Sequence, residues 1–280
     1  MENIFDPRSC KLGEGPLWHP IRKQLFWFDI LSKKLMSRVE GKPVDWVFDE
    51  YVSAAGWTGR DTLLLASDTG LWQFELDTGE CSHVVDIEAD QPLTRSNDGR
   101  ADPWGGFWIG TMGIQAEPDL GSIYRYYKGE LRKIVDAVTI SNSISFSPDK
   151  STAYFTDTPT RKIMQIALDG HDGWPTGGPE VFADLTREKL NPDGSVVDST
   201  GCLWNAQWGA GRVAQYGPDG RFIEAHKIPA AQATCPAFGG TDMKTVFVTS
   251  AADGLEGAPD GLTFQFSAKV SGQEEHRVVL

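Results

Sequence analysis

The sequence predicts an all-β fold, a six-bladed β-propeller with four antiparallel strands in each blade, in which residues 1–280 form a single domain. Three observations lead to this prediction. Aromatic residues make up 11% of the chain and occur with 30 glycines, a composition typical of short strands joined by tight turns. Helical periodicity is almost absent, and we expect one helical turn at residues 185–190. Short apolar strands instead recur every 40 to 50 residues or so, the spacing of propeller blades.

Each expected blade is centred on a short apolar strand that follows a turn rich in Gly, Asp, Pro or Lys. Another strand precedes that turn, and third and fourth strands follow. A large β-sandwich is the alternative, but it would not explain the period. We expect the ring to close where residues 9–12 pair with residues 262–266. The six central strands are expected at residues 25–29, 63–67, 107–111, 153–157, 203–206 and 246–250.

Charge and composition exclude several classes of partner. The net charge is −13 and the basic residues are scattered, so we expect no nucleic-acid partner. Residues 1–7 lack the basic and apolar regions of a secretory signal, and no apolar run approaches the roughly 20 residues that cross a bilayer. We therefore expect a cytoplasmic protein without a membrane partner. The oligomeric state is not predicted.

Cysteine and histidine give no metal pattern. The four cysteines lie far apart without a Cys-x-x-Cys pair, and the five histidines form no metal-spaced set. We expect the histidines at turns or on the surface.

Polar residues with side-chain oxygens stand at the start of four expected innermost strands. These are Glu14, Asn97, Asn142 and Asp193, each in a different blade. The first strand of every blade lines the central channel of a propeller. We therefore expect these side chains to converge on the axis, although they are far apart in the sequence.

The motifs around these residues resemble those of the regucalcin, gluconolactonase and luciferin-regenerating enzyme family, the senescence-marker-like lactonases. The resemblance covers almost the whole chain. Its motifs are Leu-Gly-Glu-Gly-Pro at 12–16, Asn-Asp-Gly at 97–99, Ser-Asn-Ser at 141–143, Pro-Asp-Gly at 192–194 and Gly-Cys-Leu-Trp at 201–204. It implies a six-bladed propeller, one divalent cation on the axis and lactone hydrolysis.

The same resemblance implies roles for individual residues. Glu14, Asn142 and Asp193 correspond to the protein ligands of the metal, and Arg95 and Asn97 to residues that hold the substrate. A further substrate position, commonly acidic in the family, falls at Gln115. Glu117 is a candidate replacement for the missing carboxylate. Without that carboxylate, we expect a preference for a lactone with an acidic substituent, or for a shorter sugar.

Two carboxylates and an amide form an oxygen-rich site suited to Ca²⁺, Mg²⁺ or Mn²⁺, with Zn²⁺ and Fe²⁺ as remaining candidates. Such a cation can polarise a lactone carbonyl and bind the attacking water. Asp193 is the expected catalytic residue, because it can accept the proton of that water. The alternative is that Asp193 is only a turn residue, since the turn sequence Pro-Asp-Gly also begins at Pro218 and at Pro259. Only the copy at Asp193 precedes an innermost strand.

The expected function is therefore that of a metal-dependent aldonolactonase, similar to gluconolactonase, acting on a small sugar-acid lactone. One alternative is a non-catalytic calcium- or ligand-binding regulatory propeller, and another is a scaffold for protein partners. Arg95 and Asn97 favour the enzyme, because a pure ion binder needs no substrate clamp. Trp57, Trp108 and Trp208 are candidates for a platform under the sugar. The sequence specifies neither the lactone nor the metal.

Overall fold

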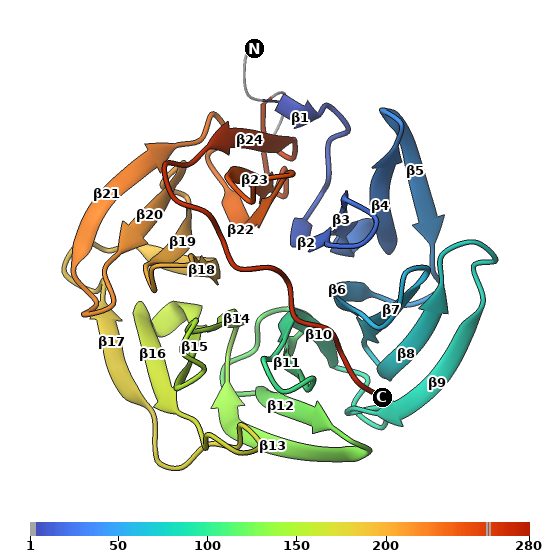
Figure 1. The fold of residues 1–280 in the computed structure, drawn as a ribbon, viewed down its shortest axis with the longest axis horizontal. Helices are drawn as coiled ribbons and strands as arrows, with labels where there is room; N and C mark the ends of the chain where they lie inside the picture. Colours follow the sequence, from blue (N-terminus) through green and yellow to red (C-terminus); the bar gives the residue numbers. More distant parts are fainter. Residues whose placement is uncertain (1–3, 256, 258) are drawn as a thin grey trace.

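A computed structural model describes residues 4–255, 257 and 259–280. Six four-stranded antiparallel sheets stand around a central axis, which confirms the predicted six-bladed propeller (Figure 1). The innermost strands, one per blade from blade 1 to blade 6, are β2 (Gly13–His19), β6 (Val52–Trp57), β10 (Thr94–Ala101), β14 (Ser141–Phe146), β18 (Asn191–Val197) and β22 (Ala233–Gly239).

The remaining strands of each blade follow outward in chain order. The second strands are β3 (Gln24–Asp29), β7 (Thr62–Ser67), β11 (Phe107–Gly113), β15 (Thr152–Asp157), β19 (Leu203–Trp208) and β23 (Thr245–Ser250). The third strands are β4 (Lys34–Val39), β8 (Gly70–Glu75), β12 (Gly121–Tyr127), β16 (Lys162–Ala167), β20 (Arg212–Tyr216) and β24 (Thr263–Ser267). The outermost strands of blades 1 to 5 are β5 (Lys42–Val47), β9 (Cys81–Asp86), β13 (Glu130–Val138), β17 (Glu180–Asp184) and β21 (Phe222–Lys227).

The chain closes the ring with β1 (Ile4–Asp6), which is the outermost strand of blade 6 and pairs with β24. The expectation that residues 9–12 would make this pairing is wrong. Those residues run inward from the rim to β2: the Cys10 N–H donates to the Gly261 carbonyl, and Leu12 forms an isolated bridge with Ala251.

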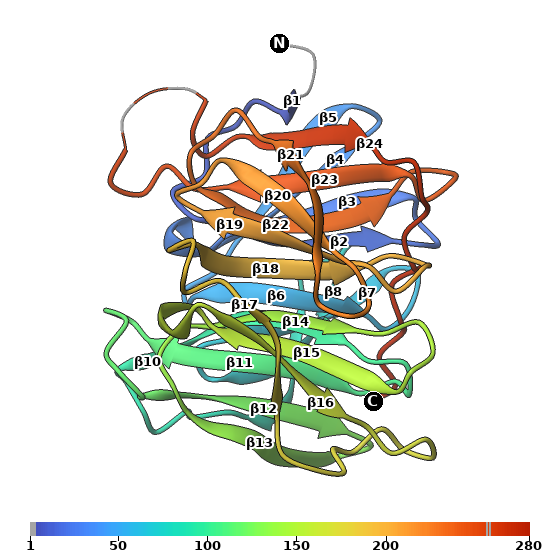
Figure 2. The ribbon, with the colours of Figure 1, turned by 90° about the vertical axis from the view of Figure 1, so that its left-hand side faces the viewer.

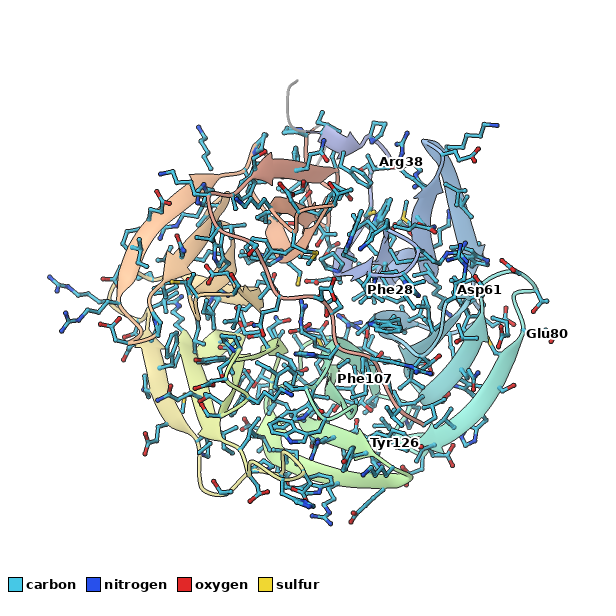
Figure 3. The ribbon with its side chains drawn as sticks, in the orientation of Figure 1. Phe28, Arg38, Asp61, Glu80, Phe107 and Tyr126 are labelled. Atoms are coloured by element: carbon cyan, nitrogen blue, oxygen red, sulfur yellow. The ribbon has the colours of Figure 1, made fainter. Side chains whose placement is uncertain are left out.

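The hydrophobic core is divided into six clusters, one between each pair of neighbouring blades. Alternate side chains of a second strand point to opposite neighbours. On β11, Phe107 faces blade 2 and Trp108 faces blade 4. Figure 3 shows Phe28 and Phe107 well inside the molecule and Glu80 at its rim. Burial on both faces explains why the second strands have continuous apolar runs.

Every innermost strand has a register shift against its second strand near its start. In β14, for example, Ser143 and Ile144 lie between the paired positions Asn142 and Ser145, and Ser143 has a φ of 62°. Bulges of this kind bend a strand and redirect its side chains. Because a bulge recurs in all six blades, the first residues of every innermost strand lie at the same mouth of the channel.

The opposite mouth is crossed by residues 269–280, here called the strap (Figures 1 and 2). It contacts blades 2 to 6. Its hydrogen bonds join Gly272 N–H to the Met243 carbonyl, Gln273 Nε2 to the Phe146 and Val197 carbonyls, Val278 N–H to the Trp57 carbonyl and Val279 N–H to the Gly105 carbonyl. Glu275 also forms a buried salt bridge with Arg100 of β10.

One smaller expectation fails, because His19 is fully buried and bonded through Nε2 to the Gly59 carbonyl. Residues 185–190 form a short hydrogen-bonded turn on the loop between β17 and β18. The helical elements of the described chain are two short 3₁₀ helices, η1 (Ile30–Ser32) and η2 (Thr158–Thr160). Within the described ranges, no helix is both long enough and apolar enough to cross a membrane.

Candidate active site

A cavity of about 550 Å³ lies at the mouth where the innermost strands begin, opposite the strap. All of the predicted site residues line it: Glu14, Arg95, Asn97, Gln115, Asn142 and Asp193. Leu12, Leu31, Met112, Ile114, Ile140, Pro159 and Trp208 supply apolar surface, and further polar residues are Thr158, Asn191 and Asp253. A cavity with apolar walls and a few convergent polar groups is typical of a small-molecule site.

The backbone brings Glu14 to the cavity through a tight approach between blades 1 and 2. Gly15 follows it with a φ of +54°. A Cβ at Gly15 would lie 2.3 Å from the Ser53 carbonyl oxygen, so only glycine fits this position. The Gly15 N–H donates to the Glu14 carboxylate at 3.0 Å.

Glu14 and Asp193 are buried together and interact through their carboxyl groups. Burial, reinforced by the charge of Asp98, raises the pKa of Glu14 to about 8. Burial and the charge of Glu14 raise the pKa of Asp193 well above its usual value. Arg95 attracts Glu14, but its Nη1 donates to the Ser96 carbonyl and to Asn97 Oδ1, both at 2.8 Å. Among the residues that the structure describes, neither carboxylate forms a salt bridge.

A chain of hydrogen bonds links Arg95 to blade 5. Asn97 Nδ2 donates to Asn142 Oδ1 at 3.0 Å, and Asn142 Nδ2 donates to Thr158 Oγ1 at 3.0 Å. The Thr158 hydroxyl then donates to the Pro192 carbonyl at 2.8 Å, next to Asp193. The chain therefore connects the proposed substrate residues with the proposed metal ligands.

Asp98 takes a structural role behind this site. Its Oδ2 accepts a hydrogen bond of 2.7 Å from the Ile144 N–H, which the bulge of β14 leaves without a ladder partner. Burial raises the pKa of Asp98 to about 6, with Arg100 acting in the opposite direction. Asp98 thereby fixes blade 4 against blade 3 beneath Asn142.

The donor set fits a divalent cation. The buried charged side chains of the innermost strands and the strap are the carboxylates Glu14, Asp98, Asp193 and Glu275 and the guanidinium groups Arg95 and Arg100. With all of them ionised, two negative charges are left unbalanced on the axis. No group of three or more His, Cys, Asp or Glu side chains in the described part of the chain is arranged to hold a metal. A cation here would instead use two carboxylates and one amide oxygen.

The loop between β11 and β12 places Gln115 at the lip of the cavity, where it is exposed. Glu117 is not among the residues that line the cavity, and its Oε2 accepts from the Gln115 N–H at 3.0 Å. Asp253, on the loop between β23 and β24, is a second exposed lip residue.

Sequence reasoning missed several lining residues. Asp253 lies in a turn whose position over the axis is not visible locally, and Asn191 begins β18 two residues before Asp193. Thr158 lies on a 3₁₀ helix outside the repeated strands. Among the candidate tryptophans, Trp208 lines the cavity. Trp108 is buried between blades 3 and 4, and Trp57 Nε1 donates to the carbonyl of Glu275 in the strap.

Known proteins resemble this chain in sequence and in structure. The family described as "SMP-30/Gluconolactonase/LRE-like region" matches residues 12–252. An L-arabinolactonase of Azospirillum brasilense is 38% identical over 90% of this chain and 84% of its own length. A pentonolactonase of Haloferax volcanii is 33% identical over 96% of this chain and 95% of its own length.

Among solved structures, a calcium-binding protein, regucalcin, from Agrobacterium tumefaciens superposes with a TM-score of 0.97 at 40% identity. The match covers 99% of this chain and 97% of that one. These relatives span the whole ring, so the expectation of a lactonase-containing family is confirmed.

Proposed function

We propose that this chain, which belongs to the SMP-30/gluconolactonase/LRE-like family, is a metal-dependent lactonase that opens a sugar-acid lactone. The observation that carries the proposal is the pair of buried carboxylates, Glu14 and Asp193, beside the amide of Asn142 in the 550 Å³ cavity. Lactonase names among relatives that align over most of the chain support the reaction class.

Glu14, Asn142 and Asp193 would hold the cation. A bound divalent cation supplies Lewis-acid polarisation of a carbonyl and a lowered pKa for water. Arg95 binds an oxygen of the lactone. Asn97 accepts from a lactone hydroxyl through Oδ1, because its two N–H donors are taken by Ser141 and Asn142. Asp193 accepts a proton as the oxygen of water forms its bond to the carbonyl carbon. It returns the proton to the ring oxygen when the carbon–oxygen bond of the ring breaks.

We place five-carbon aldonolactones first among the substrates. Two relatives are named for lactones of this class. Gln115 removes one negative charge from the lip relative to the family pattern, but Asp253 supplies another there. The lip therefore does not favour an anionic substituent, which supports the shorter sugar over the acidic one.

The test is turnover by the purified protein on a panel of arabinono-, xylono-, galactono- and gluconolactone, with a chelator and metal add-back. We expect hydrolysis above the spontaneous rate, its loss in EDTA and its recovery with Ca²⁺ or Mn²⁺. Hydrolysis that survives complete chelation would remove the metal from the proposal. Cation binding without turnover of any lactone would favour the regulatory alternative, which the calcium-binding structural relative represents.

A further inference from the structure

We propose that Thr158 is a positioning residue that holds the side-chain amide of Asn142 in the orientation in which its oxygen, and not its NH₂ group, is available as a metal ligand. The inference rests on the proposed function, because it concerns an oxygen offered to a metal. It comes from the direction of the hydrogen-bond chain from Arg95 to Pro192, and Thr158 belongs to none of the sequence motifs.

Both ends of the chain have a fixed polarity. A guanidinium group can only donate, so the group of Asn97 that faces Arg95 Nη1 must be its oxygen, at 2.8 Å. Asn97 therefore presents its NH₂ group to Asn142, and it donates at 2.8 Å to the Ser141 carbonyl and at 3.0 Å to Asn142 Oδ1. At the other end, the Pro192 carbonyl can only accept, so the Thr158 hydroxyl must donate to it.

Thr158 therefore has an acceptor left for Asn142, and it takes the hydrogen bond from Nδ2 at 3.0 Å. In the flipped orientation, the Asn142 NH₂ would oppose the NH₂ of Asn97. Its oxygen would face a hydroxyl whose proton is committed to Pro192. Two hydrogen bonds would be lost and two donors would be brought together. Arg95 and Thr158 thus select the same orientation from opposite sides.

The backbone holds Thr158 at this place between blades 4 and 5. The Thr158 N–H donates to the Ile140 carbonyl at 3.0 Å, and the Asp157 carboxylate accepts from the Ile140 N–H at 2.9 Å. Thr160 lies on the same 3₁₀ helix, but its hydroxyl donates to the Asp157 carbonyl at 2.7 Å and is exposed. Thr160 is therefore a matched control for the same substitution.

The experiment measures Mn²⁺ affinity by titration with detection of free Mn²⁺ by electron paramagnetic resonance. Thr158→Val keeps the shape of the side chain and removes the hydroxyl. We expect it to weaken Mn²⁺ binding about 10- to 100-fold, the usual effect of losing a partner that orients a ligand. Thr158→Ser should restore the affinity and Thr160→Val should leave it unchanged. The melting temperature of each metal-free variant reports folding, and Thr158→Ala replaces the valine variant if that one does not fold.

A double-mutant cycle identifies the route of the effect. If Thr158 acts through Asn142, Thr158→Val should cause no further loss of affinity in an Asn142→Ala background. Wild-type affinity in Thr158→Val, or an equal loss with and without Asn142, would overturn the inference while the metal site stands. Failure of the wild-type protein to bind Mn²⁺ or Ca²⁺ would overturn the proposed function and this inference together.

Discussion

The two mouths of the channel show opposite electrostatic arrangements on the same six strands. At the strap, Arg100 pairs with Glu275, and both side chains are at least nine-tenths buried. At the open mouth, Glu14 and Asp193 face each other while Arg95 donates to Ser96 and Asn97. One mouth is internally satisfied and contributes to the fold. The other mouth retains two buried carboxylates for which the described residues supply no salt bridge. Buried ionisable groups in such surroundings are typical of functional sites.

The largest expected effect comes from Asp193→Asn, which removes a charged group from the open mouth. Turnover under saturating metal should fall on the order of 10²-fold or more, the usual scale for an acid–base residue. Asp219→Asn is the control, because Asp219 lies in the same Pro-Asp-Gly sequence but is exposed and caps a peripheral turn through the Arg221 N–H. Equal activities of the two variants would show that Asp193 is only a turn residue.

The corresponding change at the strap is Glu275→Gln, which leaves Arg100 buried without its charged partner. We expect the free energy of unfolding to fall by about 3 kcal/mol, as for other broken buried pairs. Urea unfolding measures this loss. If the two mouths are separable, Mn²⁺ affinity of the folded variant should change less than in Glu14→Gln. A larger loss of affinity in Glu275→Gln would contradict the comparison.

Glu14→Gln should weaken metal binding at least about 10-fold, because one of two charged ligands is removed, and should leave the fold intact. It should also change the pH dependence of the metal-free protein. Burial raises the pKa of Glu14 to about 8, whereas an unfolded carboxyl titrates near 4.5. The folded state binds more protons between these values, so the free energy of unfolding should decrease as pH rises from about 5 to 8.

This decrease should be smaller in Glu14→Gln, measured by urea unfolding in EDTA at both pH values. The histidines contribute equally to both proteins, so the difference between them reports Glu14 together with Asp193, whose pKa is raised by the charge of Glu14. Parallel pH profiles would show that Glu14 does not titrate in this range.

The smallest expected effect is at the lip, where Gln115→Glu adds a solvent-exposed charge. Screening limits its influence to a few-fold decrease in kcat/KM for an acidic lactone such as glucarolactone, relative to a neutral pentonolactone. Competition assays on the two substrates measure the ratio. An unchanged ratio would remove Gln115 from the specificity argument.

The sequence was sufficient to predict the ring and the convergence of Glu14, Asn142 and Asp193, because both follow from a repeat with one strand position per blade. The features that the sequence could not predict depend on contacts between blades. Such contacts leave no local pattern in the sequence. Ring closure by Ile4 to Asp6, the Arg100–Glu275 pair and the place of Thr158 beside Asn142 are of this kind. His19 was misassigned for the same reason, since its hydrogen-bond partner lies on another blade.

The strap also affects how substrate enters the cavity and how product leaves it. The strap, residues 269–280, crosses the far mouth (Figures 1 and 2), and the cavity is lined by residues of the open mouth, so substrate and product use the open mouth. For a lactonase, the departing molecule carries a new carboxylate past Arg95, the cationic side chain that lines the cavity. Product and substrate thus compete for one passage, and accumulated sugar acid should slow the enzyme as a competitive inhibitor.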